Sequence, residues 1–115
     1  MPTAYYVNDL GSLTRWQVVR FLYPLQGGVC LICGRYLRRV EASIDHVIPR
    51  ALGGPHGIRN WALAHRRCNT LKGARLPTDE ERRRHRRLVR KITIAIWRMR
   101  LAALIRAIII REKAA

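Results

Sequence analysis

Two pairs of metal-binding residue types constrain the fold of this chain more than any other feature. Cys30 and Cys33 are separated by two residues, and His65 and Cys68 repeat that spacing downstream. Three thiolates and one imidazole make a complete tetrahedral zinc set, and a two-residue gap lets both members of a pair reach one ion from a tight turn. Two buried free cysteines would also explain the first pair taken alone, but the second pair favours zinc. We therefore expect a Cys3His zinc site that staples the segment between the two pairs.

The length and cysteine count agree with a small, metal-stabilised domain. With 115 residues the chain suffices for one domain, and much of it is polar loop around the two ligand pairs. A small core of this kind usually needs a staple such as a structural metal. Disulfides would leave one of the three cysteines unpaired, so a zinc site and a reducing, cytoplasmic location are favoured. Because no basic segment followed by an apolar one occurs at the N-terminus, we expect no signal peptide.

The charge balance indicates a polyanionic partner. The formal net charge is +16, from 23 Lys and Arg against 7 Asp and Glu. Nucleic acid is the simplest partner for such a chain, and an acidic membrane surface is the lesser alternative. The longest uncharged run near the C-terminus, residues 92–97, is far shorter than the ~18 residues of a membrane span. We therefore expect nucleic-acid binding and no membrane association.

Helix signals flank the metal-binding segment. Thr14 can cap a helix from residue 15 to about residue 22, and Pro24 favours its end. Thr78 and Glu81 form a capping box for a second helix that extends from residue 79 to about residue 112, roughly 50 Å. We accordingly divide the chain into a flexible arm (1–14), a metal-binding domain that includes the first helix (15–76) and a basic and apolar helical extension (77–115).

The C-terminal helix changes character along its length. Its first turns carry arginines that either form a solvated basic face or contact DNA phosphates, and we expect phosphate contacts from Arg82, Arg83, Arg86, Arg87 and Arg90. Farther on, one apolar stripe comprises Leu88, Ile92, Ile96, Met99 and Ala103. From residue 101 onward the apolar residues lie nearly all round the helix. Residues 88–110 therefore need a cover, which is the rest of the domain, a second copy or another protein.

Asp45 and His46 stand side by side in an apolar run between the two ligand pairs. In a strand their side chains point to opposite faces, so a bend is needed to bring both to one site. We predict two strands here, residues 35–40 and 42–47, which form a hairpin, and a short helix over residues 69–74. Between Asp9 and Asp79 the only acid besides Asp45 is Glu41, which we interpret as a surface residue. Asp45 therefore supplies the carboxylate of any hard-cation site in the core.

The ordered set of these pieces resembles the HNH endonuclease family, in its zinc-knuckle branch. The resemblance covers residues 28–74, with a weaker likeness over residues 16–28. It rests on Cys30-x-x-Cys33, Asp45-His46-x-Ile48-Pro49, Gly53-Gly54, Asn60, His65-x-x-Cys68-Asn69 and Lys72-Gly73. It implies an α+β fold with a small ββα-metal (treble-clef-like) core, in which a hairpin, a connecting loop and a helix surround one catalytic ion. It also implies hydrolysis of DNA phosphodiester bonds.

The resemblance assigns roles residue by residue. His46 is expected to be the general base that takes a proton from the attacking water, work that suits the pKa range of histidine. Asp45 and Asn69 are expected to bind the catalytic ion, Mg²⁺ or Mn²⁺, both of which prefer oxygen ligands. Asn60 is expected to hold the loop and orient His46. Lys72 is expected to lie near the DNA backbone phosphates.

Two positions depart from the commonest family pattern. Asn69 stands where many members have a histidine, and its amide oxygen favours hard ions over Zn²⁺ at the catalytic site. His65 stands where a cysteine is usual in the second knuckle. The Cys3His set remains complete, but His65 also suits the catalytic ion, which would leave a structural site of three cysteines.

Two other functions compete with the enzyme hypothesis. A catalytically silent zinc module would bind nucleic acid through the same fold, and a small basic subunit of a larger complex would use the apolar C-terminal helix. The presence of both Asp45 and His46 favours the nuclease, while His56 and His85 are interpreted as solvent-exposed. The small size, without a separate recognition domain, suits an enzyme of a phage or mobile element in a bacterial host.

Overall fold

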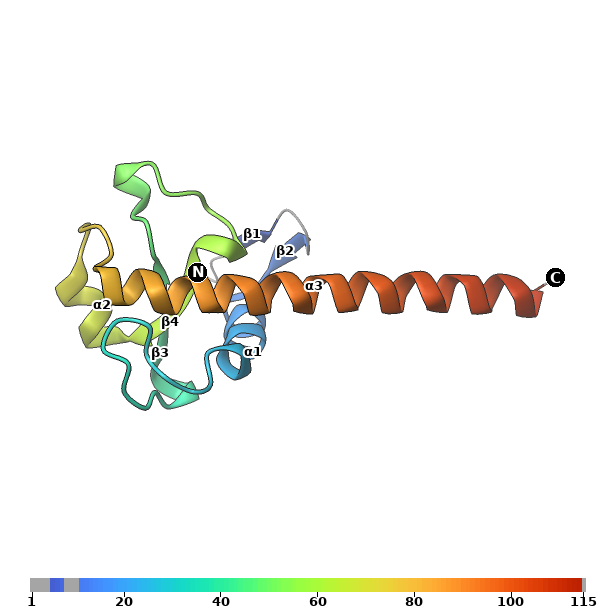
Figure 1. Ribbon diagram of the computed structural model, residues 1–115, viewed down its shortest axis with the longest axis horizontal. Helices are drawn as coiled ribbons and strands as arrows, with labels where there is room; N and C mark the ends of the chain where they lie inside the picture. Colours follow the sequence, from blue (N-terminus) through green and yellow to red (C-terminus); the bar gives the residue numbers. More distant parts are fainter. Residues whose placement is uncertain (1–4, 8–10, 115) are drawn as a thin grey trace.

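The computed structural model describes residues 5–7 and 11–114, and their side chains from residue 13 onward. A small domain carries one long helix that projects from it (Figure 1). The domain contains a hairpin of β1 (Tyr5–Val7) and β2 (Gly11–Leu13), the helix α1 (Arg15–Leu25) and the strands β3 (Ala42–His46) and β4 (Trp61–His65). The helices α2 (Arg66–Lys72) and α3 (Asp79–Ala114) follow. The α+β fold class is confirmed.

The centre of the domain is a β-hairpin followed by a helix. β3 pairs antiparallel with β4, in a register from Ala42 opposite His65 to His46 opposite Trp61. The connecting loop, residues 47–60, contains two single 3-10 turns, Arg50–Leu52 and Ile58–Asn60. α2 begins directly after β4 and ends at Gly73, whose φ of 54° no other residue type adopts easily. Hairpin, loop and helix follow in the order that the resemblance implies.

The predicted partner of β3 was wrong. Residues 35–40 form no strand and contribute only an isolated bridge, Tyr36 with Val29, before a 3-10 turn at Arg39–Glu41. β4 replaces them because residues 61–64 are fully buried and offer β3 an apolar neighbour, whereas Tyr36 and Val40 are exposed. The short helix predicted from residue 69 begins at Arg66, so Cys68 lies on a helix.

α1 ends later than its proline suggested. Thr14 and Gln17 form a reciprocal capping box at its start. Pro24 lies inside the last turn, and the helix continues past it to Leu25. The segment predicted as a flexible arm contains the hairpin of β1 and β2, and residues 1–4 and 8–10 lie outside the described residues.

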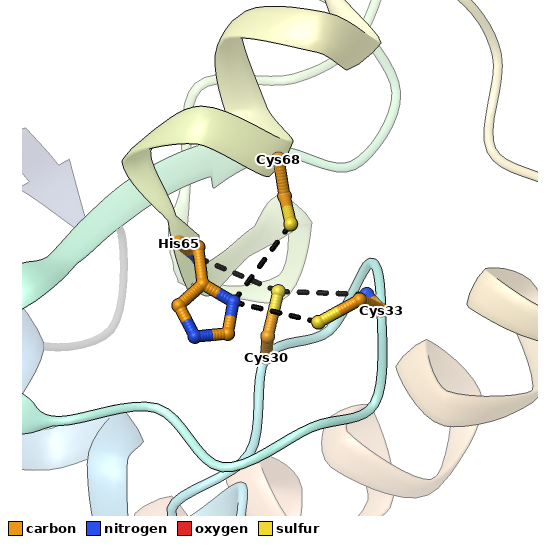
Figure 2. A group of neighbouring side chains, drawn as sticks. All are labelled: Cys30, Cys33, His65 and Cys68. Atoms are coloured by element: carbon orange, nitrogen blue, oxygen red, sulfur yellow. Dashed lines mark hydrogen bonds between the residues drawn. The ribbon is translucent and has the colours of Figure 1, made fainter.

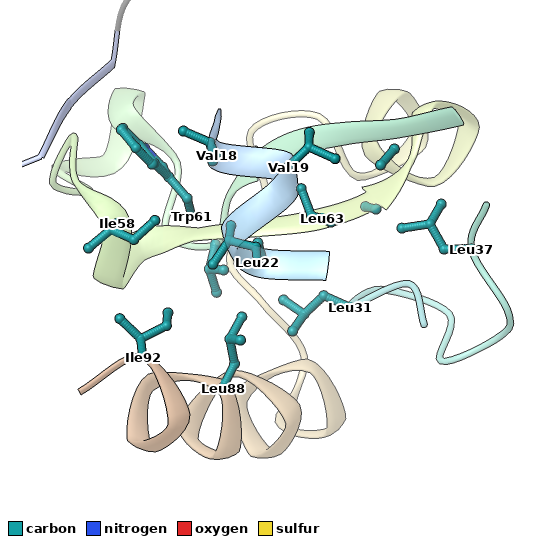
Figure 3. Packing of buried hydrophobic residues seen from close by; sticks show 14 of the residues in the cluster. Val18, Val19, Leu22, Leu31, Leu37, Ile58, Trp61, Leu63, Leu88 and Ile92 are labelled. Carbon is teal, nitrogen blue, oxygen red and sulfur yellow. The ribbon is translucent and has the colours of Figure 1, made fainter. Parts of the chain in front are cut away.

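The hydrophobic core lies where α1, β4 and the first half of α3 meet (Figure 3). α1 contributes Val18, Val19 and Leu22, all buried. Trp61 and Leu63 of β4 and Leu88 and Ile92 of α3 pack against them. A core of this size agrees with a domain that also relies on a metal staple.

α3 belongs to the domain over only part of its length. Its capping box is formed as predicted, with the Thr78 hydroxyl accepting from the Glu81 N–H and the Glu81 carboxylate accepting from the Thr78 N–H. Leu88, Ile92 and Ile96 are buried, but Met99 of the same predicted stripe is exposed. Residues 97–114 project beyond the domain, which gives the molecule a length of 58 Å. None of the described helices combines the length and apolar character that crossing a membrane requires.

Candidate active site and zinc centre

The four predicted zinc ligands gather at one point. The ligand atoms of Cys30, Cys33, His65 and Cys68 all lie within 4.8 Å of one another. Figure 2 shows the first two on the turn after α1, His65 at the end of β4 and Cys68 in the first turn of α2. The His65 Nδ1 atom is 3.4 Å from Cys33 Sγ and 3.8 Å from Cys68 Sγ. These four groups can hold a zinc ion.

Backbone groups orient the zinc ligands. The second ring nitrogen of His65, Nε2, lies 2.9 Å from the Tyr36 carbonyl oxygen, which fixes its proton there and presents the Nδ1 lone pair to the thiols. The Cys30 sulfur accepts from the backbone N–H groups of Cys33 and His65. Because both nitrogens of His65 are used in this centre, the alternative in which His65 serves the catalytic ion finds no support in the geometry.

The thiol pKa values show why this cluster suits a cation. Burial, together with the neighbouring Cys30 and Cys33, raises the pKa of Cys68 to about 11. For Cys33, burial also raises the pKa, but hydrogen bonds from the Arg35 backbone and from Cys30 outweigh it and leave the pKa lowered. Three adjacent thiolates repel one another, and a bound dication removes that penalty. The donor set therefore fits a structural Zn²⁺.

Asp45 lies in the interior and is paired with Lys72. The Lys72 ammonium donates to Asp45 Oδ1 at 3.0 Å and to the carbonyl oxygens of His46 and Val47 at 2.9 and 3.1 Å. Asp45 and Lys72 are each only 4% exposed. Burial raises the pKa of Asp45, and the hydrogen bond and charge of Lys72 oppose that rise. Lys72 therefore binds the carboxylate from within the protein instead of facing solvent.

The second oxygen of Asp45 lacks a partner. Among the residues that the structure describes, no group donates to Asp45 Oδ2, although the atom is buried. The Asn69 amide nitrogen donates to Ser43 Oγ and to the Ile44 carbonyl, so its amide oxygen is the atom left for a ligand. Asp45, His46 and Asn69 line one hollow of about 280 Å³, so the bend at the end of β3 brings them to one site. Two residues that offer an unpaired carboxylate oxygen and an amide oxygen at one hollow fit a hard divalent ion.

His46 is enclosed by two aromatic side chains of the connecting loop and β4. Its Nε2 atom lies 2.9 Å from His56 Nδ1 and accepts from the Trp61 indole at 3.2 Å. The rings of His46 and His56 are stacked. Trp61 can only donate, so the neutral His46 has its lone pair on Nε2 and His56 donates as well. Burial and the charges of His56, Arg50 and Lys72 lower the pKa of His46 to about 4, so its imidazole is neutral at physiological pH.

The family model of the HNH endonucleases matches residues 30–75. Over these residues the chain matches an HNH endonuclease domain. The segment contains both ligand pairs, Asp45, His46, Asn60, Asn69 and Lys72, so the resemblance noted from the sequence is confirmed over the whole candidate site.

A likeness among solved structures agrees with this domain assignment. The structure of the Type II-C Cas9 enzyme from Actinomyces naeslundii superposes with a TM-score of 0.51 at 19% identity, over 70% of this chain. The chain spans 13% of the length of that protein, and at this identity the likeness shows the fold alone. No curated protein matches the chain.

Asn60 fastens the two ends of the connecting loop of the HNH domain. Its carbonyl oxygen accepts from the Ile48 N–H at 3.0 Å, and its amide nitrogen donates to the Ile48 and Pro55 carbonyls at 2.9 and 2.8 Å. The Asn60 backbone carbonyl also accepts from the Val47 N–H. Asn60 thus holds the residues that directly follow His46, as a buried side chain 3% exposed.

Three residues at the site of the HNH domain escaped the sequence interpretation. His56 was interpreted as solvent-exposed, but it contacts His46, because the loop that Asn60 fastens brings residue 56 back to the strand end. Trp61 received no role at the site from the sequence. Arg50 lines the hollow beside Asp45 with an exposed side chain. Only the position of Arg50 directly after Pro49 hinted at proximity to the site.

The arginines at the start of α3 divide into two groups. Arg84 is half-buried and donates to the Leu31 and Ile32 carbonyls at 2.7 and 3.0 Å, which fastens α3 to the first zinc knuckle. His85, interpreted as solvated, contacts the Arg59 carbonyl at 2.8 Å and is half-buried. The five arginines predicted to contact DNA all have exposed side chains: Arg82, Arg83, Arg86, Arg87 and Arg90. We name these five the basic face.

Proposed function

We propose that this chain is a metal-dependent endonuclease that hydrolyses DNA phosphodiester bonds. The observation that carries the proposal is that Asp45, whose Oδ2 atom is buried and unpaired, lines one hollow together with His46 and Asn69. A carboxylate oxygen, an amide oxygen and a histidine base at one site are the groups that metal-assisted hydrolysis needs. Asp45 and Asn69 would hold Mg²⁺ or Mn²⁺, which when bound stabilises the charge on the phosphate and the leaving oxygen.

Lys72 prepares Asp45 for this role. A carboxylate that is 4% exposed tends to take up a proton, and the ammonium 3.0 Å away favours its ionised form. Because Lys72 is buried, the phosphate contact predicted for it passes, in our proposal, to Arg50, which lies at the same hollow with an exposed side chain. The guanidinium of Arg50 suits a phosphate oxygen geometrically.

His46 would take the proton of the attacking water at Nε2. That lone pair is occupied by Trp61 and His56 in this structure, so the proton transfer requires one of the two donors to give way. His56 lies on the connecting loop, which DNA can displace, while Trp61 is part of the core. In the free protein the site therefore holds its base neutral and covered until substrate enters.

The basic face would supply most of the DNA affinity. Its five arginines are exposed along the first three turns of α3, and contacts to phosphates release counterions. Binding of this kind is largely independent of sequence. The zinc centre would be structural, because all four of its ligand atoms belong to the protein. By analogy with small nucleases that lack a separate recognition domain, we also propose that the protein acts in the cytoplasm of a bacterial host, as an enzyme of a phage or mobile element.

One observation favours a second candidate. The covered Nε2 atom and the lowered pKa of His46 also suit a zinc-stapled DNA-binding module without catalysis. Nicking of supercoiled plasmid separates the two functions, with Zn²⁺ kept constant and Mg²⁺ or Mn²⁺ added against EDTA. We expect nicking that needs the added ion and falls about 10²- to 10⁴-fold in His46→Ala, the range of a lost general base. His85→Ala is the matched control, because His85 lies outside the hollow and should keep its activity. Binding without nicking under every ion would establish the module instead.

A further inference from the structure

The second half of α3 carries an apolar stripe that the domain does not use. Ile94, Trp97, Leu101, Leu104 and Ile108 follow one another at alternating intervals of three and four residues. Their exposed fractions are 53, 68, 51, 58 and 49%, and Figure 1 shows that this part of the helix projects away from the domain. We name these five residues the outer stripe. Large apolar side chains that are exposed in a regular row indicate a binding surface.

The outer stripe faces away from the domain. Each residue turns the helix by about 100°, which places the outer stripe on the side opposite to Leu88, Ile92 and Ile96, the residues that pack into the core. The outer stripe therefore lies on the face of α3 that does not pack into the core. A shallow hollow of about 270 Å³ on this face, lined by Trp97, Arg100, Leu101 and Leu104, offers space for a side chain from a partner helix.

We propose that the outer stripe binds the same stripe of a second copy of this chain, as an antiparallel two-stranded coiled coil. Alternation of three and four residues is the spacing that keeps one apolar seam facing a partner helix. Antiparallel pairing centred between Ala102 and Ala103 forms four apolar layers by symmetry. Trp97 of one copy packs with Ile108 of the other, and Leu101 packs with Leu104. The largest side chain thus meets a smaller one in each outer layer.

Charge complementarity selects the antiparallel direction. In this register Lys91 of one copy flanks Glu112 of the other, and the contact occurs twice in the dimer. Glu112 is the only acid in residues 82–114, so it is the only carboxylate that this surface offers. A parallel dimer would instead place Arg87, Arg90 and Trp97 opposite their own copies. Like charges directly opposite each other weaken such a pairing, so the parallel form is disfavoured.

The antiparallel dimer leaves the rest of the molecule accessible. The two domains lie at opposite ends of the helical pair, and Arg83 and Arg86 of each copy extend beyond the end of the paired segment. The inference does not depend on the nuclease proposal, because it rests on the outer stripe, Lys91 and Glu112 alone.

Analytical ultracentrifugation of the zinc-loaded chain tests the existence of the dimer. We expect a monomer–dimer equilibrium in the range of about 1 to 100 µM, since a short seam associates moderately. Leu101→Asp combined with Leu104→Asp should raise the dissociation constant at least about 100-fold, because two charged groups would enter the seam. Met99→Asp and Ile110→Asp are matched controls on the same helix outside the stripe and should leave the dimer intact. Circular dichroism of each variant verifies that the helix remains folded.

A charge-reversal pair tests the direction. Lys91→Glu and Glu112→Lys should each weaken the dimer by roughly 3- to 10-fold, and the double variant should restore it. In a parallel dimer these positions lie about 30 Å apart and would show no restoration. A chain that stays monomeric at about 100 µM would overturn the proposal. Loss of the dimer in the Met99→Asp control to the same extent as in the Leu101→Asp and Leu104→Asp double variant would also overturn it. Binding of residues 94–108 to anionic vesicles without self-association would overturn it as well.

Discussion

Replacement of Lys72 by Met is the substitution whose effect the structure determines most sharply. The Lys72 ammonium is the partner of Asp45 Oδ1 and donates to two backbone carbonyls, and both side chains are almost fully buried. Methionine keeps most of the volume of the side chain but removes all three donors. Loss of one member of a buried ion pair costs about 3 to 5 kcal/mol, because the remaining charge has no compensation. We expect a decrease of that size in the free energy of unfolding.

A double variant separates the ion pair from packing. The Lys72→Met substitution leaves the carboxylate charge of Asp45 unpaired, and Asp45→Asn removes that charge. The variant that carries both substitutions should therefore lose less stability than the sum of the losses in the two single variants. We expect a coupling energy of about 2 kcal/mol or more, within the range measured for contacting pairs. Lys113→Met is the matched control, because Lys113 is exposed, and it should change stability by less than about 0.5 kcal/mol.

Urea unfolding followed by circular dichroism, with Zn²⁺ present throughout, measures these values. The same proteins are then titrated with DNA. Lys72→Met at concentrations where it is folded should bind DNA about as tightly as the native chain, because its ammonium does not reach the surface. A Lys72→Met protein with native stability but weakened DNA binding would refute the structural reasoning. The contact between Lys72 and DNA phosphates that was expected from the sequence would then stand.

Four further predictions follow from other parts of the structure. Removal of zinc with a chelator should unfold the domain, since structural Zn²⁺ supplies about 10 to 16 kcal/mol in small zinc-dependent folds. When Co²⁺ replaces Zn²⁺, the protein should show thiolate charge-transfer absorption, and Cys68→Ser should weaken this absorption. Burial raises the pKa of Glu81, but bonds from Arg75 and Thr78 outweigh it and lower the pKa to about 2. Above about pH 4.5 the ionised Glu81 should therefore make the native chain about 2 to 3 kcal/mol more stable than Glu81→Gln. Urea titrations should show this difference in the free energy of unfolding decreasing as the pH falls toward 2. Burial and His56 lower the pKa of His46 to about 4, so NMR titration should find His46 neutral above about pH 5, and His56→Ala should move its pKa upward. Each of Arg83→Ala, Arg86→Ala and Arg87→Ala should reduce the slope of log affinity against log salt by about 0.9, whereas unchanged slopes would exclude the basic face from DNA contact.

The sequence predicted the zinc centre, both long helices and their caps because these features depend on local patterns. The ligand pairs show their spacing directly, and capping boxes such as Thr78 with Glu81 need only two residues at a fixed interval. The ordered motif from Cys30 to Gly73 also located the residues that line the hollow. These patterns do not depend on how distant segments pair.

Long-range pairing accounts for what the sequence did not predict. The partner of β3 lies across a connecting loop of 14 residues, and β4 was not recognised as a strand because its residues do not alternate between apolar and polar types. The burial of Lys72 depends on where α2 meets β3, and the role that the resemblance assigned to Lys72 carries no information about that burial. His56 reaches His46 only because Asn60 closes the loop, and no local pattern encodes that closure.

The single apolar stripe predicted from the sequence does not describe the outer part of α3. The stripe predicted from Leu88 to Ala103 is used by the core only up to Ile96. A second row, shifted to the other side of the helix, begins at Ile94 and continues beyond the domain. Two overlapping rows look like an all-round apolar helix when only the sequence is considered.

We propose that Asp45, Asn69 and His46 form one catalytic centre around a divalent ion. The most direct test of this proposal is the rate of plasmid nicking as Mn²⁺ is increased, at constant Zn²⁺, for the native chain and for Asp45→Asn, with stability verified for both. We predict that the Mn²⁺ concentration for half-maximal rate rises about 10-fold or more in the variant, because one ligand oxygen loses its charge. An unchanged Mn²⁺ dependence, with activity retained, would contradict the account and remove Asp45 from the site of the ion.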